Sequence, residues 1–336
     1  MPTFILRRIL SLIIVLLVAV SATFCLLRLA PGSPFALNEK QSSPEVRRQT
    51  EQKYNLEEIR EERKDEKTGK TTKHVQWGLL ASQFGRYLGV LRNNQGQHSG
   101  LLQGDLQPCL KFKDRTVAEL ISQALPVSAI LGLSALLLAT TIGVWLGSIA
   151  AVRKNTWLDS TTMLGALVAI SVPTFVTGPA LVLVFSLWLG WLPVGGWTGI
   201  SSLILPAITL AGPFIAYIAR LTRTSMLEVL NQDFVRTAHA KGLSEKRVLY
   251  KHVLKVGILP VVSFLGPLAA NLLTGSLVIE SVFSLPGMGG FFVNSVLNRD
   301  VFLCCGSVTI YCTLLVGMNL FVDITYKWLD PRIRLE

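Results

Sequence analysis

The chain has 336 residues, of which 50 % are hydrophobic and 16 % are charged, and its formal net charge is +11 at pH 7. Ordinary soluble domains carry about 25 % charged residues, so the composition excludes a disordered chain and argues against one soluble fold. The mean hydropathy of +0.48 indicates a membrane protein. Residues 31–126 hold 15 basic and 12 acidic residues, which leaves the rest of the chain poor in charge. The sequence shows no basic face with interleaved aromatic side chains of the kind that binds nucleic acid.

The first long charge-free run, residues 9–27, predicts a membrane helix, because a bilayer core needs about 20 apolar residues. Arg7 and Arg8 precede this run, as they would in a signal peptide. The apolar stretch is longer than a typical signal core, no clear small-x-small cleavage site follows it, and more spans come later. We therefore expect an uncleaved helix.

Two further charge-free runs predict three more membrane helices. The first of these runs covers residues 120–152. The second, residues 160–219, would be about three bilayers long as one helix, so it must turn. The Gly- and Trp-rich stretch 190–199 supplies the turn, which predicts helices near 161–189 and 201–219.

The last two predicted spans are residues 256–279 and 301–322, which makes six membrane helices in all. The predicted fold class is therefore an all-α integral membrane protein. We expect three parts: a tail with the first helix in residues 1–30, an external segment in residues 31–126, and a five-helix core in residues 127–336.

The Lys and Arg residues of the short loops predict the orientation in the membrane. With the N-terminus in the cytoplasm, the cytoplasmic side carries 15 of them, eight between Arg220 and Lys255. The short outer loops carry only Arg299. The long segment 31–126 also lies outside, and long loops are exempt from the rule. We expect a multi-pass protein with both termini in the cytoplasm.

Proline and glycine residues mark the predicted helices. Four prolines fall inside helices three and four, namely Pro173, Pro179, Pro206 and Pro213. Bent helices of this kind line transport pathways, but prolines are also ordinary in membrane helices. Gly143 and Gly147 form one GxxxG pair, which is weak support for a specific helix contact.

The titratable residues offer little chemistry. The five cysteines form no CxxC pattern, and we interpret them as small buried hydrophobic residues: Cys25, Cys109, Cys304, Cys305 and Cys312. The four histidines form no HExxH, so a zinc hydrolase has no support. Glu280 directly follows the fifth span, and we expect it at the membrane interface rather than in a buried ion site.

The external segment begins with mixed charge. Residues 57–67 predict either a solvated helix with i,i+4 ion pairs or a disordered stretch. Gly69-Lys70-Thr71 resembles part of a phosphate-binding loop, but its first glycine and the strand before it are missing. Residues 77–91 repeat apolar residues at helical spacing, which predicts an amphipathic helix.

The cytoplasmic loop after the fourth helix predicts a short transverse helix. Asp233 is placed to cap its start, and Gly242 to end it with a positive φ. Phe234, Val235 and Ala238 share one face of this helix. Such a helix either docks into a groove of another protein or lies on anionic lipid, and the pattern alone leaves both open.

The same loop resembles a known family. Arg236-Thr-Ala-His-Ala-Lys-Gly242, followed at Pro260 by a membrane helix, is similar to the EAA-type loop of ABC importer permeases. The resemblance extends along nearly the whole chain and is narrowest to the peptide/nickel branch and the first membrane subunit of oligopeptide permeases. Its other segments are Phe4–Arg8, Arg28–Phe35, Pro44–Val46, Lys53–Leu56, Lys111–Asp114, Leu125–Ser128, Leu192–Gly199, Ala219–Leu230, Thr274–Gly289, Asn298–Asp300 and Asp330–Ile333.

The sequence also departs from that family. The acidic residue that gives the EAA motif its name is absent, as is usual in this branch. His239 stands where the branch more often has arginine. The external segment has extra length after Leu56 and near residues 93–102.

The resemblance implies a permease of the type I ABC importer fold in the bacterial inner membrane, forming half of the pathway of an ATP-driven oligopeptide importer. It implies four kinds of partner: a second homologous permease, two cytoplasmic ATPases, an external peptide-binding protein and membrane lipid. ATP and magnesium would bind the ATPases, so the chain itself is expected to hold no cofactor, metal or catalytic residue. The ATPase-coupling residues implied are Asp233, Phe234, Arg236, Thr237, Ala238, His239, Ala240, Lys241 and Gly242.

Other functions remain open at this point. Within the same family the substrate could be a dipeptide, a cell-wall peptide or nickel. An ion-coupled secondary transporter would carry ionisable residues inside its helices, and the charge-free spans argue against it. A membrane-embedded enzyme would need a catalytic pair near a membrane face, and the histidine positions offer none.

Overall fold

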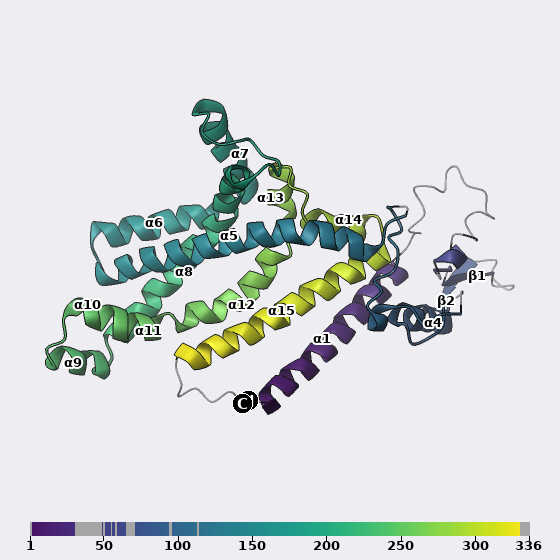
Figure 1. Cartoon of the computed structure of the whole chain (residues 1–336), viewed down its shortest axis with the longest axis horizontal. Coiled ribbons are helices and arrows are strands. Elements are labelled where there is room, and N and C mark those ends of the chain that lie inside the picture. Colours follow the sequence, from purple (N-terminus) through teal and green to yellow (C-terminus); the bar gives the residue numbers. More distant parts are fainter. Residues whose placement is uncertain are drawn as a thin grey trace. The chain divides into compact units, whose positions relative to one another are not determined.

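Figure 1 shows the chain as a computed structural model. The structure describes residues 2–30, 49, 51–54, 56–57, 59–64, 71–93, 96–112 and 114–329. The chain divides into two compact units. The first unit comprises Met1–Leu12, Ala124–Gly290 and Thr313–Glu336, and the second unit comprises Ile13–Gln123 and Phe291–Cys312. The segments Gly69–Lys70, 31–35, 44–46 and 330–333, which the sequence analysis singled out, lie outside the described residues.

Four single helices of the described chain are long and apolar enough to cross a membrane. They are α1 (Pro2–Leu29), α5 (Val117–Val152), α8 (Ile200–Leu230) and α15 (Val301–Leu329). Two bent helix pairs pass the same test, so the count is six if each pair is one span. The helical membrane fold predicted from the charge-free runs is confirmed.

The third predicted helix, residues 161–189, is broken in the structure. α6 (Trp157–Ser171) is followed by α7 (Thr174–Leu181) and a π-helical turn (Val182–Trp188), with a bend of 104° between the two parts. Val172 and Pro173 both have extended backbone at the break. Proline disfavours the helical region for the residue before it, which explains why the helix stops here rather than kinks.

The fifth predicted helix, residues 256–279, also differs. It is preceded by a continuous helical segment made of α10 (Glu245–Val248), a π turn (Leu249–Val253) and α11 (Leu254–Gly257). A bend of 48° then leads into α12 (Leu259–Leu273). The backbone turns again at Gly275, where φ is +94°, before the short α13 (Leu277–Val282) begins.

The core of the first unit contains a close contact between α5 and α8. A Cβ atom on Gly147 would lie 2.4 Å from the carbonyl oxygen of Ala219, and one on Gly143 would lie 2.8 Å from the Ile218 side chain. The GxxxG pair is therefore a specific packing site, because only glycine lets the two backbones approach this closely. Around it lies an apolar core that includes Leu131, Leu205 and further buried residues of α12 and α13.

The second unit contains the small elements of the long loop. They are β1 (Arg60–Lys64), β2 (Thr71–Val75), α4 (Trp77–Leu88), the 3₁₀ turn η1 (Leu101–Gln103) and α14 (Gly289–Leu297), whose first two residues belong to the first unit. α4 confirms the predicted amphipathic helix and ends at Gly89, which has a left-handed backbone with φ +82°.

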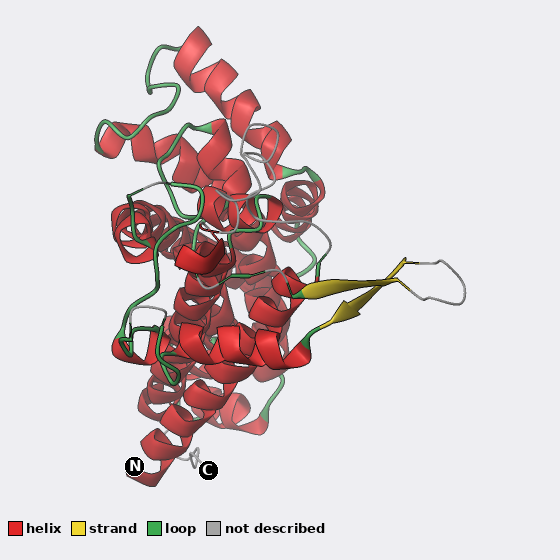
Figure 2. Cartoon of the chain, turned by 90° about the vertical axis from the view of Figure 1, so that its right-hand side faces the viewer, coloured by secondary structure: helices red, strands yellow, loops and turns green. Residues whose placement is uncertain are grey.

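The charged stretch after Leu56 is a strand, and both predicted alternatives are wrong for residues 60–64. β1 pairs antiparallel with β2, with Glu62 opposite Lys73 in the register; Figure 2 shows the pair as a hairpin. Ion pairs at i,i+4 stabilise a helix by only about 0.2–0.5 kcal/mol each. Thr71, Thr72 and Val75 are β-branched and favour the extended pairing, and this local preference prevails.

Aromatic rings join three helices inside the second unit. Phe24 of α1 stacks on Tyr87 of α4 at 5.6 Å between ring centres, and Tyr87 stacks on Phe302 of α15 at 5.9 Å. Arg28, at the end of α1, donates to the Gln83 side chain at 2.9 Å and to the backbone oxygen of Glu57 at 2.6 Å. These contacts make the part of α1 from Ile13 onward an integral part of this unit.

Candidate functional site

The predicted transverse helix exists as α9 (Asp233–Ala240), which follows the end of α8. Figure 1 shows α9, α10 and α11 together at one end of the first unit. The prediction that Asp233 caps the helix is wrong: the capping position is Gln232, which makes no side-chain capping bond. Asp233 is the first helical residue instead and forms a loose ion pair with Arg236 at 3.5 Å. A carboxylate there still favours the helix, because it faces the positive end of the dipole.

α9 has a buried face, formed by two of the three residues that the sequence placed on one side of the helix. Val235 is 2 % exposed and Ala238 is 6 % exposed. Both pack into a cluster of the chain's own side chains that includes Met226, Val248 and Val253. Ala238, one of the nine residues implied for coupling, therefore has its side chain covered by this chain.

The rest of α9 is exposed, including Phe234, which the sequence placed on the same face as Val235 and Ala238. Eight of the nine predicted coupling residues are exposed, namely Asp233, Phe234, Arg236, Thr237, His239, Ala240, Lys241 and Gly242. Phe234 is 40 % exposed although its side chain is large and apolar. An aromatic ring beside basic side chains forms a knob of the kind that enters a groove with an acidic rim.

Gly242 ends this helical turn as predicted. Its φ is +77°, and its N–H donates to the carbonyl oxygen of His239 at 2.9 Å. A Cβ atom at Gly242 would meet no atom within 4 Å. The requirement for glycine here is therefore one of backbone conformation and not of space.

Met226 anchors the loop to α8. A Cβ atom on Gly257 would lie 2.9 Å from the Met226 side chain, so α11 rests directly on α8 at this point. One turn earlier on α8, Arg223 binds both oxygens of Asp159 on α6 at 2.6 and 2.7 Å. The N–H of Asn155 donates to Asp159 at 2.9 Å. This bidentate pair was missed from the sequence, because nothing in the local pattern relates two residues 64 positions apart.

A second polar cluster lies around Glu280. This residue is 3 % exposed, so the chain's own groups enclose its carboxylate, and the interfacial position stays a prediction. Its carboxylate accepts from the Ser128 hydroxyl at 2.6 Å, the Gly289 N–H at 2.8 Å and the Ser276 N–H at 3.3 Å. Burial raises the pKa of Glu280 above its ordinary value, while these donors act in the opposite direction.

Glycines make room for that carboxylate. A Cβ atom on Gly275, Gly287 or Gly289 would lie between 2.3 and 2.9 Å from the Glu280 carboxyl group. The Ser128 hydroxyl also accepts from the Met288 N–H at 2.7 Å, so one buried serine joins α5 to the 284–289 loop. The Thr274–Gly289 segment quoted for the family resemblance is thus the wall of one carboxylate cage.

The 190–199 turn packs against the same region. The N–H of Gly196 donates to the carbonyl oxygen of Phe283 at 2.8 Å, and a Cβ atom on Gly195 would lie 2.4 Å from that oxygen. This turn precedes α8, whereas α9 follows it, and a helix of 31 residues is about 45 Å long. The carboxylate cage around Glu280 and the exposed residues of α9 therefore lie at opposite ends of α8.

The second unit has its own buried carboxylate. Asp300 accepts from the Cys109 thiol at 2.9 Å and from the N–H groups of Leu110 at 2.8 Å and Leu303 at 3.0 Å. Burial, together with the nearby Asp300 charge, raises the pKa of Cys109 to about 12. The thiol is therefore protonated and structural, as expected for a buried cysteine. All five cysteines are free.

Neither of two hollows in the described chain suits a peptide, because one has no charged lining residue and the other is too small. A cavity of about 370 Å³ lies among α5, α6 and α8, and small or apolar residues such as Gly165, Ala169 and Gly212 line it. A peptide has charged ends, and no charged side chain lines this cavity.

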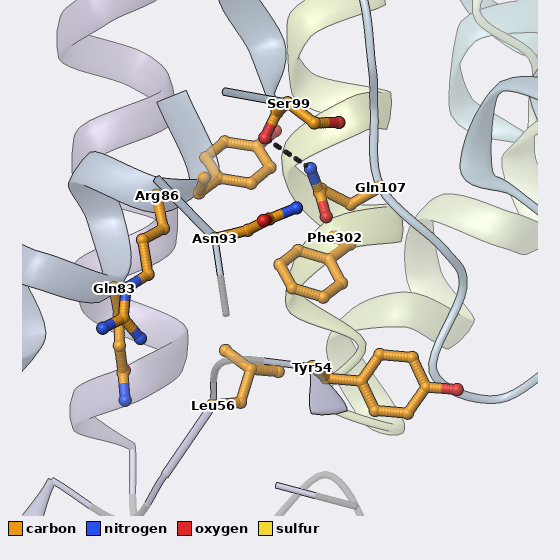
Figure 3. Close-up of a pocket in the computed structure, with 9 residues that line it drawn as sticks. Tyr54, Leu56, Gln83, Arg86, Asn93, Ser99, Gln107 and Phe302 are labelled. Atoms are coloured by element: carbon orange, nitrogen blue, oxygen red, sulfur yellow. Dashed lines mark hydrogen bonds between the residues drawn. The ribbon is translucent and has the colours of Figure 1, made fainter. Parts of the chain in front are cut away.

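The other hollow belongs to the second unit and is shown in Figure 3. Its volume of about 10 Å³ is close to that of one water molecule. The Gln107 side chain closes one side by donating to the Ser99 carbonyl oxygen at 3.1 Å. Tyr54 and Phe302 also line it. Among the described residues no group of three or more His, Cys, Asp or Glu is placed to hold a metal ion.

Comparison with known proteins gives consistent matches along the chain. Residues 143–335 match the protein family described as "Binding-protein-dependent transport system inner membrane component". The "Oligopeptide transport system permease protein OppB" of Haemophilus influenzae is 41 % identical over 336 residues, covering 99 % of this chain and 100 % of the relative. The protein of the same name from Escherichia coli (strain K12) is 40 % identical with the same coverage. The "Dipeptide transport system permease protein DppB" of Bacillus subtilis is 36 % identical, covering 100 % of this chain and 99 % of the relative.

Proposed function

The chain belongs to the family of binding-protein-dependent transport system inner membrane components, and we propose that it is the permease subunit of an ATP-driven oligopeptide importer. As a member of this family it is a multi-pass inner-membrane transport subunit and not an enzyme. Such systems have ATPase and binding-protein partners. The observation that carries the proposal is that α9 exposes Phe234 and Arg236 while Val235 and Ala238 of the same helix are buried.

The physical reason is that a coupling element has to be exposed and firmly held at once. The exposed side of α9 is available for an ATPase, while the buried side is packed on Met226 of α8. A push on α9 would therefore be transmitted to a helix about 45 Å long that spans the membrane. ATP and magnesium would be bound by the ATPase, and this chain would supply the knob.

The substrate we propose is an oligopeptide. Support comes from the higher identity to the oligopeptide permeases, 41 % against 36 % for the dipeptide permease, at nearly equal coverage. A dipeptide, a cell-wall peptide or nickel are the alternatives within the same family. The uncharged cavity among α5, α6 and α8 offers no partner for peptide termini, so the pathway would form against a second permease subunit.

We also propose an orientation with both termini in the cytoplasm. The 15 Lys and Arg residues on that side, against Arg299 on the other, support it. The external segment, residues 31–126, would then face the peptide-binding protein, and α9 would face two cytoplasmic ATPases.

Paired substitutions test the coupling role of α9. We expect Phe234→Ser/Arg236→Glu to insert normally, since both side chains are exposed. Peptide uptake and recovery of the ATPase with the purified permease should both fall at least about tenfold, as for a hot spot at an interface.

The matched control is Trp157→Ser/Arg153→Glu, which changes an exposed aromatic and an exposed arginine where α5 leads into α6. The control should keep ATPase recovery. Normal uptake and normal ATPase recovery in the Phe234→Ser/Arg236→Glu variant would contradict the proposal.

A further inference from the structure

The helical segment Glu245–Gly257, which leads into α12, has one strictly buried side. Val248, Val253 and Gly257 are buried and are spaced five and four residues apart. The π turn at Leu249–Val253 adds one residue to the turn, which keeps Val248 and Val253 on the same side.

The other side of the segment is basic. Five of its exposed residues are Lys246, Arg247, Tyr250, Lys251 and Lys255, and Glu245 and Val256 at its two ends are exposed as well. Arg247, Lys251 and Lys255 follow at intervals of four residues, about one turn each, so they form a row along the segment. We call these five residues the basic strip. None of its four cations forms an ion pair in the part of the chain that the structure describes. The nearest acidic residue in the sequence is Glu245, at the start, and His252 is half-buried beside the row.

The position of the basic strip is set by α12. The segment passes directly into Leu259–Leu273, which carries no charged residue, with a bend of 48° between them. A helix that enters the bilayer as α12 would therefore leave the basic strip at the headgroup level, tilted away from the direction of the span.

We propose that the basic strip binds the phosphate groups of anionic phospholipids in the cytoplasmic leaflet. The proposal rests on the orientation given above. The strip has four cations that form no ion pair among the described residues, against one acidic residue in the segment, Glu245, so it complements a negative surface. Tyr250 is 65 % exposed, and an aromatic ring between lysines is typical of the membrane interface, where its polar end meets water and its ring meets lipid.

The exposed side of α9 has a different chemistry, which is why we assign it to a protein. It mixes Asp233 with Arg236 and Lys241 and carries Phe234. A mixed surface with an apolar ring suits a shaped groove, whereas a uniform row of cations next to a span suits lipid headgroups.

The test compares two variants that each remove one arginine and one lysine. Arg247→Gln/Lys251→Gln removes part of the basic strip, and Arg236→Gln/Lys241→Gln removes the same charges from α9 and the residue after it. The full transporter is placed in phosphatidylcholine nanodiscs and titrated with fluorescent phosphatidylglycerol. Each cation near an anionic surface contributes about fivefold in binding, so the strip variant should lose about 25-fold in affinity. The α9 variant should bind the lipid like wild type.

Three results would overturn the proposal. The first is unchanged affinity for phosphatidylglycerol in the strip variant. The second is an equal loss in the α9 variant, which would mean that net charge alone attracts the lipid. The third is loss of the ATPase in the strip variant with lipid affinity retained, which would make the basic strip a protein interface. That last result would leave the coupling role of α9 intact, so the two proposals fail separately.

Discussion

At the scale of single residues, the polar side chains that join helices are those whose pairing could not be predicted from their spacing in the sequence. Glu280 and Ser128 are 152 positions apart, and Asp159 and Arg223 are 64 positions apart. Each joins two helices through a buried or partly buried polar contact. The burial of Glu280 could not be predicted, because an acidic residue next to an apolar run carries no sign of the donors that the fold brings to it.

Removal of the Glu280 carboxylate should destabilise the first unit. Glu280→Ala leaves the Ser128 hydroxyl and the N–H groups of Ser276 and Gly289 without their acceptor, and each buried unsatisfied donor costs about 1–3 kcal/mol. Ser128→Ala removes one donor to the carboxylate and should cost less. Thermal unfolding of the purified permease should show the highest midpoint in wild type and the lowest in Glu280→Ala. An unchanged midpoint in Glu280→Ala would show that the carboxylate cage contributes no net stability.

Gly242 should be required for its backbone conformation alone. Gly242→Val forces a β-branched residue into the left-handed region at a cost of about 1–2 kcal/mol, whereas asparagine tolerates that region. Because a Cβ atom there meets no neighbour, any defect comes from a re-aimed α9 and not from a clash. Gly242→Val should lower peptide uptake at a normal membrane level, and Gly242→Asn should keep most of it. Equal uptake in the two variants would contradict this reading.

At the scale of elements, the sequence predicted what local patterns determine. Long charge-free runs located α1, α5, α8 and α15, and the helical repeat of leucines and aromatics located α4. Breaks were missed where the local pattern stays apolar, as between α6 and α7, where Pro173 ends a helix instead of bending it. β1 was missed because its charges are equally compatible with a helix, and only pairing with β2 favours the strand.

The transverse helix α9 shows the same division between local and long-range information. Its existence and its glycine stop followed from the sequence. The direction in which its apolar face points could not be predicted, since Val235 and Ala238 could pack against either this chain or a partner. In the structure both side chains pack in the cluster that includes Met226 of α8, so of the predicted coupling residues Phe234 and Arg236 stay exposed and Ala238 does not.

At the scale of the whole molecule, the first unit has polar ties at both ends of α8. The exposed α9 follows that helix, and the 190–199 turn, tied to Phe283, precedes it. An ATP-driven permease needs such a rigid connection, because work done at one end must change access at the other. The runs 160–219 and 256–279 contain no Asp, Glu, Lys or Arg, which disfavours ion coupling through these spans.

The central claim is that import by this permease is driven by ATP through its partners. Its most direct test is uptake of a labelled oligopeptide by vesicles that contain the chain with its second permease subunit, the ATPases and the peptide-binding protein. We predict accumulation that requires ATP and the binding protein, proceeds without an ion gradient, and is not reduced by excess nickel. Accumulation by the permease subunits alone, driven by an ion gradient and unaffected by ATP, would contradict the account.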